Sequence, residues 1–309
     1  MDQEENRRVG LIVGREKDWP KAFISEMEER GEGITAEFIK IGATFMDAVC
    51  PYPVIIDRMS QVIPYYRAYV KYAAMHGSYI INDPFVWSAD SRFFGTAVAN
   101  RLGLTSPRTV VLPNKDIETP VIPDSFRNLD YPMDWEGIIN YVGVPAILKE
   151  TRSGGRRWAH RVNSVDDLIQ RYDESGTRTM ILQEIIDGGE HIHCLVIGQE
   201  KVMPLRYSPA ENCYEEDNSF PDNSLTRQIF NSATAISQAY GYDINMIEYI
   251  LHEDQFFVIN STNPAPVIDR QLMTERQFKW AVKETVLLAI KRVREPLPQR
   301  VTFEFTDTD

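Results

Sequence analysis

Strands and helices alternate in the N-terminal part of the chain, and this alternation constrains the fold more than any other feature of the sequence. Apolar segments typical of buried strands occupy residues 9–13, 36–41, 54–57 and 78–81, and helical spacing of apolar residues occurs at 20–30 and 65–76. This order is typical of a parallel sheet covered by helices. We therefore expect an N-terminal α/β domain over residues 1–105. The first strand lacks a following GxGxxG turn, which argues against a dinucleotide site there.

The rest of the chain has the pattern of two lobes with mainly antiparallel strands. A helix at 89–102 precedes a proline-rich connection at 113–133, which is typical of either a surface loop or a link between lobes. Predicted strands follow at 146–149, 158–162, 179–185, 192–197 and 201–205, with helices at 165–172, 226–240 and 274–293 and a hairpin at 244–251 and 255–260. The expected fold class is α/β: the N-terminal domain, then an α+β module with a small lobe at 106–190 and a C-terminal lobe at 191–309.

Composition excludes several classes of protein. The 309 residues carry 45 acidic and 33 basic side chains, and a net charge of −12 argues against a nucleic-acid partner or an anionic membrane surface. The three cysteines contain no CxxC pair, which argues against a disulfide framework or a cysteine zinc site. No apolar segment approaches the roughly 18 residues that span a membrane, and no signal peptide follows Met1. We expect a cytoplasmic protein.

Lys149 ends an apolar strand just before a glycine turn. Glycines allow backbone N–H groups to approach an anion, and a lysine held by a strand supplies a point charge. The turn contains Ser153, Gly154 and Gly155. This pattern predicts phosphate binding, and the alternative for Lys149 by itself is an ordinary solvated surface lysine.

Three separated features resemble the ATP-grasp ligases: Lys149 with its glycine turn, the strand at 180–186 that leads to Glu190, and the hairpin that ends at 260–266. That superfamily includes D-alanine–D-alanine ligase, and the resemblance here is to the branch of glutathione synthetase and the ribosomal-protein glutamate ligases. It extends over residues 9–293. The resemblance implies an ATP-grasp module with ATP and two Mg²⁺ ions as cofactors.

The resemblance assigns the nucleotide ligands. Lys149 would bind the ATP phosphates, and Arg92 stands where these enzymes usually carry a second phosphate-binding lysine. Arginine keeps the charge and can bind two oxygens at once. The glycine turn would cover the phosphates, Glu190 would bind the ribose, and the segment that holds adenine would contribute Gln183, Glu184 and Ile186. Each assignment has an alternative without a ligand. Arg92 would then be an ordinary surface arginine, the glycine turn a solvated turn, and the adenine segment an edge strand.

The resemblance also implies a metal site built from Glu248, Asn260 and Asn263. Asn260 stands where related enzymes have Asp or Glu, and its amide offers a neutral oxygen, so the second ion should bind more weakly. In a second alignment Ser261 takes that place. The alternative is a capped turn at 260–266 without metal. His191 and His193 flank Ile192 on a strand without a complementary pair nearby in the sequence, which argues against zinc. Related ligases often have Arg at position 193.

The implied reaction joins a carboxylate to an amine. A carboxylate attacks the γ-phosphate of ATP, and an amine or thiol then captures the acyl-phosphate. Arg206 is a candidate for the γ-phosphate or the acceptor carboxylate, and Asn245 for orienting the same groups. The expected partners are small-molecule carboxylates and amines, such as amino acids or a peptide. Because related ligases often pair, a homodimer through the N-terminal domain is expected.

Two other functions remain open. The residues at Arg92, His193 and Asn260 depart from the pattern of the superfamily, which is also expected of a degenerate protein that binds nucleotide or a metabolite without efficient ligation. A scaffold that binds a partner and no nucleotide would leave Lys149 and Glu248 without a joint role.

Overall fold

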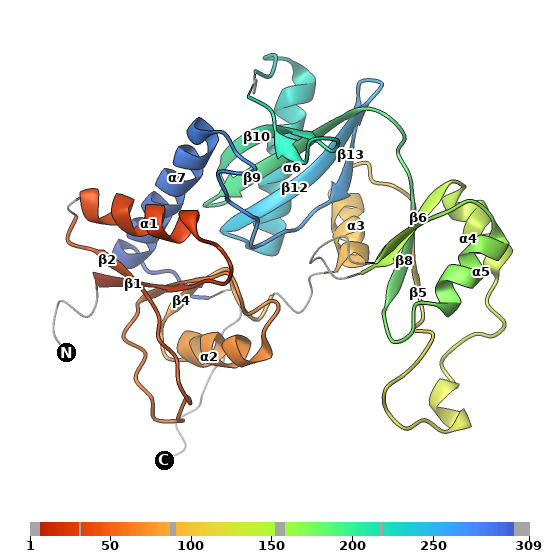
Figure 1. The fold of residues 1–309 in the computed structure, drawn as a ribbon, viewed down its shortest axis with the longest axis horizontal. Coiled ribbons are helices and arrows are strands. Elements are labelled where there is room, and N and C mark those ends of the chain that lie inside the picture. The colour runs from red at the N-terminus through yellow and green to blue at the C-terminus, as the bar shows by residue number, and fades with distance from the viewer. Residues whose placement is uncertain (1–6, 31, 87–90, 152–157, 217–218, 300–309) are drawn as a thin grey trace. The chain divides into compact units, whose positions relative to one another are not determined.

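The computed structural model describes residues 7–30, 32–86, 91–151, 158–216 and 219–299 (Figure 1). The chain forms two compact units. The first contains Met1–Ala89, His191–Glu248 and Thr262–Asp309, and the second contains Asp90–Glu190 and Tyr249–Ser261. The predicted N-terminal domain and most of the predicted C-terminal lobe thus share one unit. The predicted divisions at residues 105 and 190 stay predictions.

A four-stranded parallel sheet forms the N-terminal part of the first unit, in the order β2-β1-β3-β4. Its strands are β1 (Arg8–Ile12), β2 (Thr35–Phe38), β3 (Val54–Asp57) and β4 (Tyr79–Ile81). Helices α1 (Asp18–Glu29) and α7 (Glu275–Arg294) cover one face, and α2 (Pro64–Met75) covers the other (Figure 1). The buried strands and flanking helices confirm the expected α/β arrangement.

A five-stranded sheet follows, in the order β11-β10-β9-β12-β13. Its strands are β9 (Glu190–Ile197), β10 (Lys201–Ser208), β11 (Cys213–Tyr214), β12 (Ile244–His252) and β13 (Gln255–Asn260). Helix α6 (Ser224–Tyr240) begins at Asn223, whose side chain accepts the N–H of Thr226, and ends at Gly241, which has the left-handed φ of 70° that favours glycine. One hydrophobic core joins residues of β1, β3, β9, β10, β12 and α7.

The second unit contains a four-stranded sheet in the order β5-β8-β6-β7, with antiparallel pairing throughout. Its strands are β5 (Thr109–Leu112), β6 (Ala146–Glu150), β7 (Ala159–Val162) and β8 (Met180–Glu184). Helices α4 (Trp135–Val142) and α5 (Val165–Asp173) pack on one face around Leu148, Leu168 and Leu182. Helix α3 (Arg92–Arg101) and the short 3-10 helix η3 (Pro123–Phe126) complete the unit.

The structure adds elements that the sequence pattern did not predict. Strand β5 is a short segment between two prolines, α4 follows the linker, and β11 contains only two residues. Each is short, so periodicity gives little signal. The predicted helix at 89–102 begins instead at Arg92, where the Ser91 side chain caps the helix by accepting the N–H of Phe94. Within the described residues, we find no helix with the length and apolar character needed to cross a membrane.

Candidate nucleotide-binding and metal-binding residues

Lys149 lies on β6 in the second unit, on the sheet face opposite α4 and α5. Its neighbour Leu148 is fully buried under those helices, and successive side chains of a strand point to opposite faces. The Lys149 Nζ donates to Gln183 Oε1 at 2.7 Å, and the Gln183 Nε2 donates to Thr109 Oγ1 at 3.0 Å. Gln183 is only 2% exposed. A buried amide on the adjacent strand therefore fixes the ammonium group.

Arg92, the first residue of α3, joins the same end of β6. Its backbone N–H donates to the Thr151 carbonyl oxygen at 2.8 Å, and its Nη1 donates to the Glu150 carbonyl oxygen at 3.2 Å. These partners follow Lys149 directly in the sequence. The structure thus brings together the two cationic residues that were predicted to bind phosphate. The oxygens of Gln183 and Glu150 orient the two cationic groups.

Glu184, predicted to lie beside adenine, uses its side chain to hold β5. Its carboxylate accepts hydrogen bonds from Arg108 Nη2 at 2.7 Å and from the Arg108 backbone N–H at 3.0 Å. The hydrogen bond from the Arg108 guanidinium lowers the pKa of the Glu184 carboxyl below its ordinary value. The Glu184 N–H donates to the Arg108 carbonyl oxygen at 2.9 Å. In this structure the side chain therefore acts as a link between two strands.

The remaining predicted nucleotide ligands surround a glycine turn. Gly189 has a φ of 91°, and a Cβ atom there would lie 2.4 Å from the Leu251 carbonyl oxygen, so the turn requires glycine. Half-buried Ile186 precedes the turn, and half-buried Glu190 begins β9 after it. Their roles stay predictions. Ser153, Gly154 and Gly155 lie outside the described residues.

Glu248 stands in the first unit beside an aromatic cluster. On β12 it shares a sheet face with Met246, which belongs to the core. The His193 Nδ1 lies 3.1 Å from the Tyr214 hydroxyl, and the His193 ring stacks on Tyr207 with centroids 4.6 Å apart. Burial raises the pKa of Tyr214, and the Glu248 charge raises it further. Burial lowers the pKa of His193, and the Glu248 charge opposes that shift. The carboxylate therefore acts electrostatically on both rings.

Asn245 and Asn263 are joined within the first unit. The Asn245 Oδ1 accepts the Asn263 N–H at 2.9 Å, its Nδ2 donates to Ser237 Oγ at 3.4 Å, and the Met246 N–H donates to the Asn263 carbonyl oxygen at 3.0 Å. Asn245 is completely buried, and strand alternation directs it to the face opposite Glu248. Asn245 therefore positions the backbone of Asn263, which was predicted to bind metal.

Asn82, to which the sequence patterns assigned no role, holds the same region. Its Nδ2 donates to the carbonyl oxygens of Ile244 at 2.8 Å and Pro264 at 3.0 Å, and its Oδ1 accepts the Ile244 N–H at 2.9 Å. It is 1% exposed. The signal in the sequence is a polar amide immediately after the apolar strand β4, but its two distant partners cannot be read from local pattern.

Arg206 lies away from Glu248 within the first unit. It pairs with Ile192 across β9 and β10, so its side chain leaves the sheet on the face opposite Tyr207. The guanidinium Nη2 donates to the Ser219 carbonyl oxygen at 3.0 Å, and its carbon lies 4.7 Å from the centre of the Phe220 ring. The structure therefore does not bring Arg206 together with Glu248, and its predicted role in phosphate or carboxylate binding stays untested.

The residues predicted to bind metal offer mainly amide oxygens and only one carboxylate. Among the described residues, no group of three or more His, Cys, Asp or Glu side chains is arranged to hold a metal ion. The predicted set contains one carboxylate, Glu248, with amides from Asn260 and Asn263. Asn260 ends β13 in the second unit and is 9% exposed, and the alternative Ser261 is 3% exposed. Carboxylate and amide oxygens fit a hard cation such as Mg²⁺, with less charge than two carboxylates would supply.

The solved structures that resemble this chain share one fold, although similarity in sequence is low. No protein-family model matches the chain. A D-alanine–D-alanine ligase of Psychrobacter sp. (strain PRwf-1) is 25% identical over 118 residues, which cover 37% of this chain and only 36% of that relative. Among solved structures, a RimK domain ATP-grasp protein from Sphaerobacter thermophilus has a TM-score of 0.65 at 14% identity, covering 92% of this chain and 99% of the other.

A second solved structure agrees with the first. The D-alanine–D-alanine ligase from Bacillus anthracis, in complex with ATP, has a TM-score of 0.60 at 12% identity and covers 94% of this chain and 99% of its own. The chain therefore has the ATP-grasp fold. The expected parallel and antiparallel sheets are confirmed.

Proposed function

We propose that the chain is an ATP-dependent ligase that joins a carboxylate to an amine. The observation that carries this proposal is the arrangement of Lys149 and Arg92 at one end of β6, where neutral partners orient both cations. The ATP-grasp fold supports it, as does the similarity to D-alanine–D-alanine ligases, although the chain matches only 36% of the first such relative. Amino acids or short peptides are the proposed substrates.

The proposed reaction has two steps. A carboxylate oxygen of the acid attacks the γ-phosphorus of ATP, the bond to the β,γ-bridging oxygen breaks, and ADP leaves. The amine nitrogen then attacks the acyl carbon of the acyl-phosphate, and inorganic phosphate leaves as the amine loses a proton. Lys149 and Arg92 neutralise charge on the phosphates, which is the main contribution that a protein makes to phosphoryl transfer.

Magnesium, when bound, would supply further charge stabilisation to the phosphates. Glu248 and Asn263 in the first unit are the residues of this chain that would hold it. Asn245 and Asn82 keep Asn263 and the neighbouring backbone in place. Because the set includes one carboxylate, we expect weaker magnesium binding than a site with two carboxylates would give.

The single carboxylate also favours a second candidate function, a degenerate ATP-grasp protein that binds nucleotide without efficient ligation. The two functions differ in the effect of Asn260→Asp. In a degenerate protein this substitution should raise magnesium affinity or start phosphate release. No change in either would count against the degenerate function.

The first experiment is thermal unfolding with ATP alone, Mg²⁺ alone and both together. A ligand at about one hundred times its dissociation constant adds about 2.7 kcal/mol of stability, so a live site gives a clear shift. Lys149→Ala should remove the ATP shift, whereas Lys115→Ala, which removes an exposed cation paired with Asp173, should keep it. An ATP shift that survives in Lys149→Ala would remove the basis of the proposal and favour a scaffold.

A further inference from the structure

The sheet of the second unit has two faces of different character. Helices α4 and α5 cover the face that carries Leu148, Val162 and Leu182. Because successive side chains of a strand point to opposite faces, Lys149 on β6 and Arg161 on β7 both belong to the other face. The sequence patterns assigned no role to Arg161, although it shares this face with the lysine proposed to bind phosphate.

Strand register fixes the position of Arg161 on this face. Arg161 pairs with Ile147 across β7 and β6, and Ile147 pairs with Gln183 across β6 and β8. These three residues therefore form one row across neighbouring strands. The Lys149 ammonium donates to Gln183 at 2.7 Å, so it leans toward the β8 side of the row. Arg161 thus lies on one side of Ile147, and the Lys149 ammonium lies on the other.

The part of this face that lies over β6 and β7 is open. Arg161 is exposed and Ile147 is half-buried. By contrast, Ile181 and Gln183 on β8 are buried. In the part of the chain that the structure describes, the Arg161 guanidinium has one partner, because its Nε donates to Asn163 Oδ1 at 3.4 Å. An apolar side chain and a cation without an ion pair therefore lie side by side where a ligand can reach them.

The two ends of β6 differ in the residues that they bring together. The proposed phosphate ligands Lys149 and Arg92 meet at its C-terminal end. Its N-terminal end pairs with the C-terminal end of β8, where the segment predicted to hold adenine begins. Asn163, the partner of Arg161, follows β7 at that same end of the sheet. Arg161 therefore lies toward the proposed base and away from the proposed phosphates.

The charge on this face suits an anionic ligand. The acidic residues of the four described strands, Glu150 and Glu184, belong to the face that α4 and α5 cover. Lys149 and Arg161 therefore share the opposite face of these strands with no acidic side chain, in a chain that has 45 acidic and 33 basic residues. A cationic and partly apolar surface fits a nucleotide, which combines an apolar ring with negative charge.

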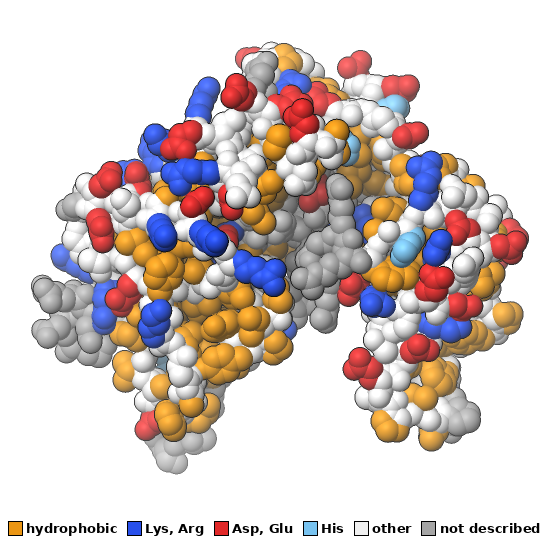
Figure 2. All heavy atoms as spheres, viewed as in Figure 1, with side chains coloured by type: hydrophobic (Ala, Val, Ile, Leu, Met, Phe, Trp, Pro, Cys, Tyr) orange, Lys and Arg blue, Asp and Glu red, His pale blue; other side chains and the backbone are white. Residues whose placement is uncertain are grey.

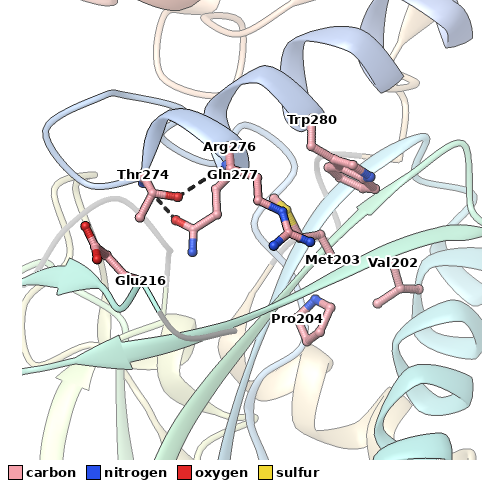
Figure 3. A pocket seen from close by; sticks show the side chains of 8 residues that line it. All are labelled: Val202, Met203, Pro204, Glu216, Thr274, Arg276, Gln277 and Trp280. Atoms are coloured by element: carbon pink, nitrogen blue, oxygen red, sulfur yellow. Dashed lines mark hydrogen bonds between the residues drawn. The ribbon is translucent and has the colours of Figure 1, made fainter. Parts of the chain in front are cut away.

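A cavity of about 220 Å³ in the first unit lacks this combination. It lies between the start of α7 and strand β10. Figure 3 shows Arg276 near Trp280 and the Glu216 carboxylate at the opposite end of the cavity. Opposite charges that point apart favour neither a simple anion nor a simple cation. We therefore assign no ligand to this cavity.

We propose that Arg161 binds the base of ATP on the open face of the sheet in the second unit. The base lies over Ile147, and the planar guanidinium contacts the face of the ring, to which a cation is attracted. Because every base has such a face, this contact adds affinity without choosing among bases. The inference rests on the proposed ATP site and adds to it a residue that contacts the base.

The test is calorimetric titration of the full chain with ATP, GTP and inorganic tripolyphosphate, in the presence of Mg²⁺. Arg161→Gln removes the proposed contact from an exposed side chain. Arg171→Gln is the matched control, because it removes a cation from α5, on the other side of the sheet, where Arg171 pairs with Asp167 and Glu174. Lys149→Ala tests the phosphate site itself, and thermal unfolding checks that each variant is folded.

We expect Arg161→Gln to weaken binding of ATP and of GTP by the same factor, about threefold to tenfold, and to leave tripolyphosphate binding unchanged. Arg171→Gln should bind all three ligands as the unsubstituted chain does. Equal ATP affinity in Arg161→Gln and the unsubstituted chain, with ATP binding lost in Lys149→Ala, would overturn this inference alone. Equal weakening of ATP and tripolyphosphate would also overturn it, since Arg161 would then contact phosphate. If the unsubstituted chain binds no ATP, the proposed function fails and this inference fails with it.

Discussion

At the scale of single residues, one hydrogen-bonded chain crosses three strands of the second unit. It runs from Lys149 on β6 through Gln183 on β8 to Thr109 on β5. The middle residue is buried, so each of its two hydrogen bonds forms away from water. The position of the Lys149 ammonium, and with it the proposed contact with phosphate, therefore depends on an amide that binds no phosphate itself.

Gln183→Leu should weaken ATP binding and lower stability. It keeps the side-chain volume but leaves the Lys149 ammonium without this acceptor, and a lost buried partner costs about 1–3 kcal/mol. Urea unfolding and titration with ATP measure the two effects. Gln255→Leu, which removes an exposed hydrogen bond to Thr105, is the matched control. Equal ATP affinity in both variants would contradict the positioning role of Gln183.

Glu184 makes stability depend on pH. Arg108 lowers the pKa of this carboxyl from its ordinary value of 4.5, so the folded chain binds a proton less readily than the unfolded chain. The stabilisation is fully present at pH values above the pKa of the unfolded chain. It is lost as the pH falls from that value through the lower pKa of the folded chain. The difference in unfolding free energy between the unsubstituted chain and Glu184→Gln should thus shrink from pH 7 to pH 3. A difference that stays constant across this range would exclude the link.

At the scale of elements, Asn82 and Asn245 hold the segment that follows β13. Asn82 comes from the loop after β4 and binds the backbone at Ile244 and Pro264, and Asn245 on β12 binds the backbone of Asn263. Buried amides of this kind fix backbone geometry because an unpaired backbone group away from water is costly. The parallel sheet therefore helps to position a residue proposed to bind magnesium.

Asn82→Ala should destabilise the first unit by about 2–4 kcal/mol, because it leaves three buried backbone groups without this partner. It should also reduce the magnesium-dependent part of the ATP shift, since the backbone at Pro264, next to Asn263, loses its support. Asn100→Ala removes an exposed side-chain hydrogen bond with Ser106 and should change neither property. Unfolding in urea and thermal shifts with ATP and Mg²⁺ are the measurements. An unchanged magnesium effect in a destabilised Asn82→Ala would limit this residue to a structural role.

At the scale of the whole molecule, the first unit exposes apolar side chains on α2, on the loop that precedes α2 and on the loop between β2 and β3. Figure 2 shows hydrophobic side chains gathered over α2. The Tyr72 hydroxyl on α2 lies 2.7 Å from the Met46 carbonyl oxygen and 2.9 Å from that of Ala48, so the loop is held along the helix. Six apolar side chains in these segments define the surface, and each is 44–83% exposed: Phe45, Met46, Val49, Val62, Tyr65 and Met75.

This apolar surface is the proposed contact of a homodimer. Its six side chains present on the order of 600 Å², at the upper limit for the largest patch of a monomer and close to the roughly 800 Å² that each partner gives to a standard interface. The chain carries a net charge of −12, so two copies repel each other over much of their surface. A surface with few charges is where a second copy can approach.

The double variant Met46→Lys with Val49→Asp should be monomeric in sedimentation velocity at concentrations where the unsubstituted chain is a dimer. Val267→Asp places a charge on another exposed apolar residue of the first unit and should leave the dimer intact. A monomer for the unsubstituted chain at working concentration would refute the interface.

Local pattern was sufficient for much of the fold and for part of the candidate site. The strand that carries Lys149, the strand–helix alternation around β1 and β3, and the hairpin of β12 and β13 can be predicted from the sequence, because burial on one or both faces of an element sets the spacing of its apolar residues. The short elements β5, α4 and β11 escaped this reasoning because a few residues carry no measurable period.

The sequence by itself determined which segments form strands and helices and which charged residues end them, since these depend on neighbours along the chain. Only the tertiary structure decided that Gln183 holds Lys149, that Arg92 joins the end of β6, and that Asn82 binds the backbone at Pro264. It also separated Arg206 from Glu248: Leu205 and Met246 face one core, so strand alternation places Glu248 on that side of the sheet and Arg206 on the other. These relations are fixed by strand register and by hydrogen bonds between distant segments, which no local spacing encodes.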